Sequence, residues 1–78
     1  MTGTDADLVA LGRALRILRR RADLTQAEVG KRVGIRNTHV SAVERGERGL
    51  SYRTLIAMLR AYKATLRDLV DEMDRGDV

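Results

Sequence analysis

The 78-residue sequence contains no cysteine and no proline, and Tyr52 and Tyr62 are its only Tyr, Phe or Trp residues. Without cysteine, the chain can form neither a disulfide bond nor a cysteine-ligated zinc site. The scarcity of strand-forming aromatic residues and the absence of proline favour helices. No apolar run approaches the roughly 20 residues that span a membrane, and the first residues lack the basic and apolar parts of a signal peptide. We therefore expect one all-α, cytoplasmic domain.

The net charge of +4 is concentrated in the first two thirds of the chain. Residues 1–24 hold five Arg against three Asp, a balance of +2. Residues 25–53 hold six Lys or Arg against three Glu, a balance of +3, whereas residues 54–78 hold four against five and sum to −1. A basic surface suggests an anionic partner for this part of the chain, although an ordinary solvated surface gives the same composition.

Apolar residues that recur every three or four positions predict five helices. Thr25 and Glu28 have the spacing of a capping box at the start of the second helix, and Gly34 can adopt the left-handed conformation that ends it. The predicted helices cover about 5–21, 26–33, 37–45, 52–62 and a last segment from Thr65 through Met73. The two ends of the chain, 1–4 and 75–78, should fray.

The second and third helices are short and meet at a tight turn, and the third has two different faces. At about 100° per residue, Val40 and Val43 face the core. The opposite face carries short or basic residues, namely Thr38, Ala42 and Arg45. Short side chains let a helix backbone approach the floor of the DNA major groove. A solvated face without a ligand is the alternative explanation for this helix.

Two further positions suggest how these helices are held in place. Glu44 lies on the inward side of the third helix, where a carboxylate is costly without a partner. Arg19, at the margin of the apolar stripe of the first helix, is the candidate partner, and we predict a buried, bidentate ion pair. The alternative is that both side chains reach water. Gly30 falls where the second and third helices cross, and a side chain larger than alanine there should hold them apart.

These residues together resemble the Cro/C1-type, or XRE-type, helix-turn-helix family of phage repressors and small bacterial regulators. The matching segments are 24–35, 40–46, Ser51 to Leu55 and Leu66 to Leu69. The resemblance covers roughly residues 8–70 and implies a five-helix, phage-repressor-like fold, with the helix-turn-helix at the second and third helices; the length predicts one domain over 1–78. It also implies the pair between the first and third helices. The chain departs from the family where Arg36 replaces a Ser/Thr cap, Leu50 a proline and Lys63 a glycine.

The resemblance also implies which residues meet DNA. The residue at the start of the second helix contacts a phosphate, the outward residues of the third helix meet base edges, and their neighbours touch backbone or bases. Asn37 suits bidentate contact with adenine, and exposed arginines near the motif are further phosphate candidates. The predicted base contacts are Asn37, Thr38, Ser41 and Ala42, and the predicted phosphate contacts are Gln26, Arg36, His39, Arg45, Arg48 and Arg53.

A small module of this kind reads few base pairs, so we expect a homodimer on a palindromic operator. The predicted dimer interface consists of Ile56, Leu66, Leu69, Val70 and Met73, with the alternative that all five belong to the internal core. The expected function is a sequence-specific, double-stranded-DNA-binding transcriptional regulator. A phage-type repressor, a restriction–modification controller and an autoregulating antitoxin all fit. The rival function is an antitoxin or adaptor that mainly binds a protein partner. No enzyme activity, cofactor or metal site is expected.

Overall fold

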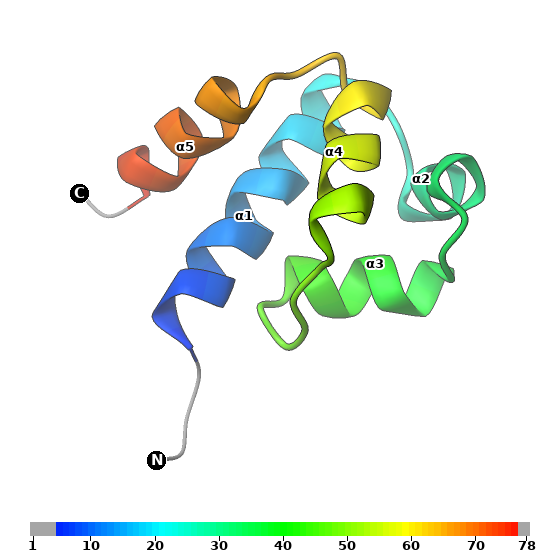
Figure 1. Cartoon of the computed structure of the whole chain (residues 1–78), viewed down its shortest axis with the longest axis horizontal. Helices are drawn as coiled ribbons and strands as arrows, with labels where there is room; N and C mark the ends of the chain where they lie inside the picture. Colours follow the sequence, from blue (N-terminus) through cyan, green and yellow to red (C-terminus); the bar gives the residue numbers. More distant parts are fainter. Residues whose placement is uncertain (1–4, 77–78) are drawn as a thin grey trace.

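The computed structural model describes residues 5–76, which form five helices and no strand (Figure 1). The helices are α1 (Ala6–Arg21), α2 (Gln26–Val33), α3 (Asn37–Glu44), α4 (Tyr52–Ala61) and α5 (Leu66–Arg75). The all-α prediction is confirmed, and the predicted helix bounds differ by a residue or two. The fraying predicted for 1–4 and 77–78 lies outside the described residues. Arg75 is the last residue of α5 and Gly76 is its C-cap, so the fraying predicted there concerns the end of a helix.

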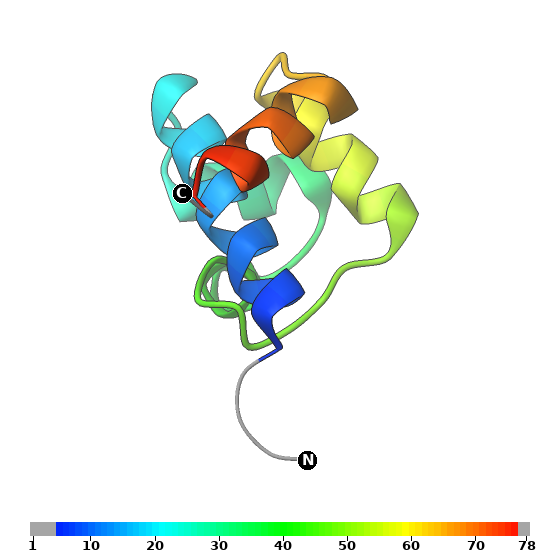
Figure 2. The ribbon, with the colours of Figure 1, turned by 90° about the vertical axis from the view of Figure 1, so that its left-hand side faces the viewer.

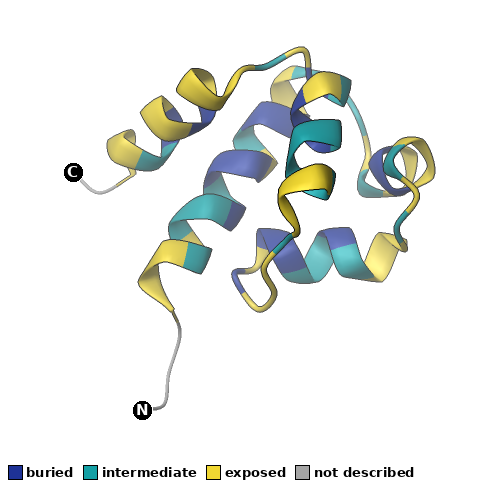
Figure 3. Ribbon diagram, in the orientation of Figure 1, coloured by how far each residue is buried: buried dark blue, intermediate teal, exposed yellow. Residues whose placement is uncertain are grey.

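The long helix α1 lies at the centre of the fold. It packs against α5 on one side and against α3 on another, while α2 packs against α3 and α4 (Figures 1 and 2). The core contains Leu15 and Leu18 of α1, Val40 and Val43 of α3, and Met58 of α4. Most of α5 is exposed, in contrast to α1 (Figure 3). Within 5–76, no helix has both the length and the apolar character needed to cross a bilayer.

Short-range hydrogen bonds fix where the helices of the motif begin and end. Thr25 and Glu28 form the predicted capping box, in which the Thr25 hydroxyl accepts from Glu28 N and the Glu28 carboxylate accepts from Thr25 N at 2.8 Å. The bond from the Thr25 backbone holds the pKa of Glu28 below its usual value. Gly34 ends α2 with a φ of 86°. At the start of α3, Arg36 makes no side-chain cap, as its replacement of a Ser/Thr predicts.

Two glycines allow helices to approach closely at the motif. A Cβ at Gly12 would overlap the carbonyl oxygen of Val43, so α1 can lie on the end of α3 only because this residue has no side chain. A Cβ at Gly30 would lie 2.6 Å from the carbonyl oxygen of Ile35. The sequence predicted that only side chains larger than alanine would hold the two helices apart at Gly30. The structure excludes alanine as well, because the atom that its Cβ would meet belongs to the backbone of Ile35.

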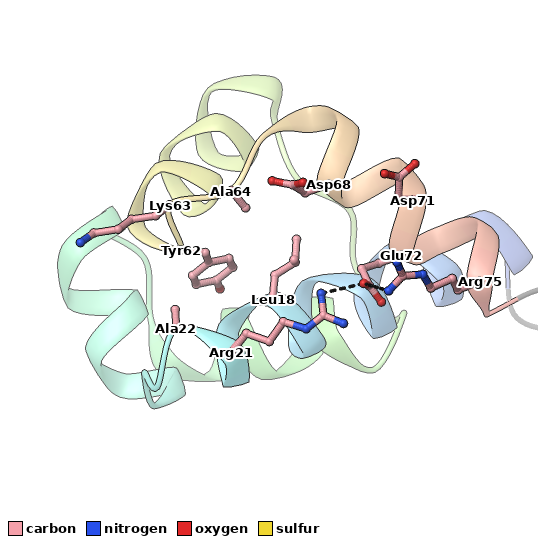
Figure 4. A pocket seen from close by; sticks show the side chains of 10 residues that line it. All are labelled: Leu18, Arg21, Ala22, Tyr62, Lys63, Ala64, Asp68, Asp71, Glu72 and Arg75. Atoms are coloured by element: carbon pink, nitrogen blue, oxygen red, sulfur yellow. Dashed lines mark hydrogen bonds and ion pairs between the residues drawn. The ribbon is translucent and has the colours of Figure 1, made fainter.

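Polar contacts tie α5 to α1. Glu72 is 5% exposed and forms ion pairs with Arg21 at 2.7 Å and with Arg75 at 2.8 Å. Figure 4 shows both guanidinium groups directed at this carboxylate, on the wall of a hollow of about 310 Å³. Arg13 donates to the carbonyl oxygens of Glu72 and Met73, both at 3.2 Å. On a helical wheel of α1 alone, Arg13 points away from the core, but the C-terminal end of α5 lies on that side.

Candidate nucleic-acid interface

A buried ion pair joins α1 to α3. Arg19 Nε donates to Glu44 Oε2 at 2.6 Å and Arg19 Nη2 donates to Glu44 Oε1 at 3.0 Å. Nη1 of Arg19 donates to the carbonyl oxygen of Leu24 at 2.8 Å. The hydrogen bonds to Glu44 raise the pKa of Arg19 above its usual value. The two residues are 9% and 8% exposed, so this is the bidentate, buried pair expected from the sequence.

Gln26 extends this pair toward solvent. Its Nε2 donates to Glu44 Oε1 at 3.0 Å, so the carboxylate accepts bonds from α1 and from the first residue of α2. The remaining N–H and the carbonyl oxygen of the Gln26 amide stay available, and the side chain is half-buried. The first residue of α2 is thereby held in a defined position beside α3.

The face of α3 opposite the core is the part of the motif that a ligand can reach. Asn37 and Thr38 are exposed, and Ser41 and Ala42 are half-buried. The side chains of Asn37 and Thr38 form no hydrogen bond with a residue of 5–76. Asn37 shares a hollow of about 430 Å³ with Thr25, Gln26 and other residues at the start of α2. An amide and a hydroxyl are therefore free for an external partner at the beginning of α3.

Comparison with known proteins shows which family this chain is similar to. A family model described as "Helix-turn-helix domain" matches residues 10–73. The structure resembles the restriction–modification controller protein C.AhdI from Aeromonas hydrophila, with 34% identity over 83% of this chain and 98% of that one and a TM-score of 0.77. It also resembles the clp gene regulator ClgR from Corynebacterium glutamicum, with 28% identity over 88% and 73% of the two chains and a TM-score of 0.84. No curated protein matches significantly.

The chain belongs to the helix-turn-helix family. Its Cro/C1-type (XRE-type) character, predicted from the sequence, is confirmed. A variant of the controller protein C.Esp1396I shares the fold at 15% identity, with a TM-score of 0.84 over 95% of this chain and 94% of that one.

Within this helix-turn-helix, the guanidinium group of Arg45 already forms hydrogen bonds with two neighbouring side chains. Its Nε and Nη2 donate to the two carboxylate oxygens of Glu47, both at 3.0 Å, and its Nη1 donates to Ser41 Oγ. The bond to Glu47 raises the pKa of Arg45, and the same bond lowers the pKa of Glu47. Both side chains are more than half exposed, and an exposed pair of this kind is easily released. The pair with Glu47 therefore offsets the charge of Arg45 beside the predicted DNA contacts of α3.

His39, one of the predicted phosphate contacts, is half-buried. Its Nε2 atom is buried and has no hydrogen-bond partner within 5–76. A phosphate contact through Nε2 is therefore not available in this conformation, because the atom faces the protein interior. The resemblance gave His39 only as a contact with DNA backbone or nearby bases, and the position of His39 in the first turn of α3 gave no sign of this burial.

The other predicted phosphate contacts surround the motif. Arg36 occupies the N-cap position of α3, Arg48 lies in the loop after α3, and Arg53 lies in the first turn of α4. All three are exposed and form no ion pair with a residue of 5–76. Arg16 and Arg20 of α1, which are not among the residues predicted to meet DNA, border a hollow beside Gln26 and Ser41. A wheel shows that both point away from the core, but only packing shows which neighbours they meet.

One predicted dimer residue belongs to the core instead. Leu69 is 3% exposed and packs among the buried residues, so it is not available to a second subunit. Ile56 and Met73 are partly buried against the same core. Leu66 and Val70 are 43% and 51% exposed, so only these two of the five residues present a large apolar surface. Apolar periodicity alone does not separate the two sides of α5.

Proposed function

We propose that the protein is a transcriptional regulator that binds double-stranded DNA in a sequence-specific manner. Asn37 and Thr38 would read base edges in the major groove, and Gln26 would hold a backbone phosphate at the start of α2. The observation that carries the proposal is the free polar face of α3 on a helix fixed from behind by the Arg19–Glu44 pair. The similarity to C.AhdI supports a controller-type regulator. The cytoplasmic location and the absence of enzyme activity are parts of this proposal.

The regulator acts, in this proposal, as a homodimer on a palindromic site. Leu66 and Val70 lie one turn apart on α5 and border a hollow of about 490 Å³ together with Arg67 and Asp71. A two-fold axis through this face would place each apolar pair on its copy and Arg67 opposite Asp71 of the partner subunit. Neither of these charged residues forms an ion pair within 5–76. Two copies would then present two α3 helices to half-sites about 34 Å apart.

The decisive experiment is a gel shift with DNA taken from upstream of the protein's own gene, beside a random duplex of equal length. The proposal predicts preferential binding that weakens steeply as salt rises, because phosphate contacts release counterions. No binding even at low salt would reject it and favour the adaptor or antitoxin function, in which the exposed face of α5 receives another protein.

The dimer is tested separately by sedimentation equilibrium. Val70→Asp should shift the wild-type dimer to a monomer, because it places a charge on the apolar face. Val9→Asp is the matched control, since Val9 is 41% exposed on α1 and lies outside the proposed interface. A wild-type monomer at concentrations of tens of micromolar would contradict the dimer without touching the DNA-binding proposal.

A further inference from the structure

A basic hollow lies beside the helix-turn-helix, between α1 and the other two helices of the interface. Its volume is about 380 Å³, and it is lined by Arg16, Arg19, Arg20, Gln26, Ser41, Glu44 and Arg45. Four of these seven residues are arginines that come from α1 and from the end of α3. The hollow therefore extends the candidate DNA surface from the motif onto α1.

The charges in this hollow do not cancel. The Glu44 carboxylate is neutralised by Arg19 behind it, and Arg45 is paired with Glu47. Arg16 and Arg20 are exposed, and neither forms an ion pair with any residue of 5–76. Two uncompensated positive charges thus stand one turn apart along the same wall of the hollow.

The opposite wall supplies groups that bind an oxyanion. The Gln26 amide keeps one N–H after its bond to Glu44 at 3.0 Å. Gln26 also opens α2, where the positive end of the helix dipole and free backbone N–H groups favour a negative ligand. Arg20 and Gln26 border the neighbouring hollow at the start of α2 as well. That second hollow contains Asp23, so the first is the more positive of the two.

We propose that Arg16 and Arg20 of α1, together with the Gln26 amide, bind the phosphodiester backbone of the DNA strand that borders α3. This inference rests on the proposed DNA-binding function and adds two contacts to it. A phosphodiester carries one negative charge and accepts hydrogen bonds from guanidinium and amide N–H groups, so it matches the chemistry of both walls. Because phosphate contacts carry no base information, both arginines serve affinity and register on the duplex.

The test is the salt dependence of binding to a fluorescent duplex of random sequence, measured by anisotropy. The logarithm of the binding constant falls linearly with the logarithm of the salt concentration, and each lost phosphate contact makes this slope shallower by about 0.9. Arg16→Ala and Arg20→Ala should each reduce the slope by about that amount, and the affinity roughly five- to tenfold at moderate salt. Arg20→Lys retains the charge and should keep most of the slope, because lysine binds phosphate as a point charge.

Arg60→Ala is the matched control. Arg60 is exposed in the last turn of α4 and borders neither of the two hollows next to the motif. The Arg60→Ala substitution removes the same charge, so it measures how much of any change in salt slope comes from net charge alone. All variants should keep the wild-type melting temperature, because the side chains of Arg16 and Arg20 form no hydrogen bond within 5–76.

The outcomes separate the two proposals. In one outcome, the wild type binds with a steep salt slope, while Arg16→Ala and Arg20→Ala reduce that slope no more than Arg60→Ala does. This result would overturn the α1 phosphate contacts and leave the DNA-binding function intact. A wild-type protein that fails to bind the duplex at low salt would remove the DNA-binding function itself.

Discussion

The consecutive residues Glu44 and Arg45 at the end of α3 each form a bidentate pair with the opposite charge, yet the two pairs differ in what they do. The inner pair, Arg19–Glu44, has side chains that are 11% and 3% exposed. In the outer pair, Arg45–Glu47, the exposed fractions are 56% and 57%. The two geometries are nearly the same, so burial decides the role of each pair. The inner pair holds α3 on α1, whereas the outer pair lies in solvent beside the face of α3 that is predicted to meet DNA.

The largest effect is expected from breaking the inner pair. Arg19→Ala leaves the Glu44 carboxylate buried without its cation, and the removal of one partner from a buried pair costs about 3–5 kcal/mol of unfolding free energy. Thermal and urea unfolding measure this loss. Arg20→Ala, one residue further along α1, is the matched control and should leave the stability unchanged. A melting temperature for Arg19→Ala equal to that of the wild type would show that the pair does not hold α3.

The next effect concerns the free face that the inner pair supports. Asn37→Ala should narrow the difference in affinity between specific and random DNA by about 1–3 kcal/mol, because a bidentate amide contact to adenine is lost. Competition binding with the two duplexes gives this difference, and the melting temperature should not change. An equal loss of affinity for both duplexes would make Asn37 a positioning residue.

Opening the outer pair should change DNA binding and not stability. Glu47→Gln removes a negative charge beside the DNA face and frees the guanidinium of Arg45 for a phosphate. We expect affinity for random duplex DNA to rise severalfold and the salt slope to steepen by up to about 0.9. Arg45→Ala should do the reverse. If Glu47→Gln binds more weakly than the wild type, the outer pair positions Arg45 for DNA and does not mask it.

The smallest effect is the pH dependence that the capping box contributes. The folded-state pKa of Glu28 is held below its usual value by the bond from the Thr25 backbone. A depressed folded pKa means stability that is present above the unfolded pKa and lost as the pH falls through the folded one. Glu28→Gln should therefore lose less stability than the wild type as the pH falls from about 5 to about 3. Equal acid sensitivity of the two proteins would show that the box makes no net contribution.

The inner and outer pairs also show which contacts of the candidate site the sequence can predict. The carboxylate of Glu44 falls on the inward side of an amphipathic helix, and only a long cation from a neighbouring helix can reach it, so periodicity predicts Arg19 as its partner. The Arg45–Glu47 pair lies where α3 has ended, and no helical rule places those side chains. The bond from Gln26 to Glu44 depends on how α2 docks, which the spacing of apolar residues does not specify.

The same limit explains the errors on α1 and α5. Arg13 lies on the outward side of α1 when that helix is considered alone, yet α5 covers this side and presents its last carbonyl groups there. Leu69 and Val70 follow one another on α5, and one is core while the other is exposed. Helix existence and capping are local properties of the chain, whereas these placements depend on packing between distant segments.

A double-mutant cycle on the inner pair tests the central claim most directly. Arg19→Met, Glu44→Leu and the double variant would be compared with the wild type in unfolding free energy. If burial makes each partner depend on the other, both single variants lose several kcal/mol and the double variant loses much less than their sum, with a coupling of about 2–3 kcal/mol. Additive losses, with no coupling, would contradict the claim that this pair holds α3 in place for DNA.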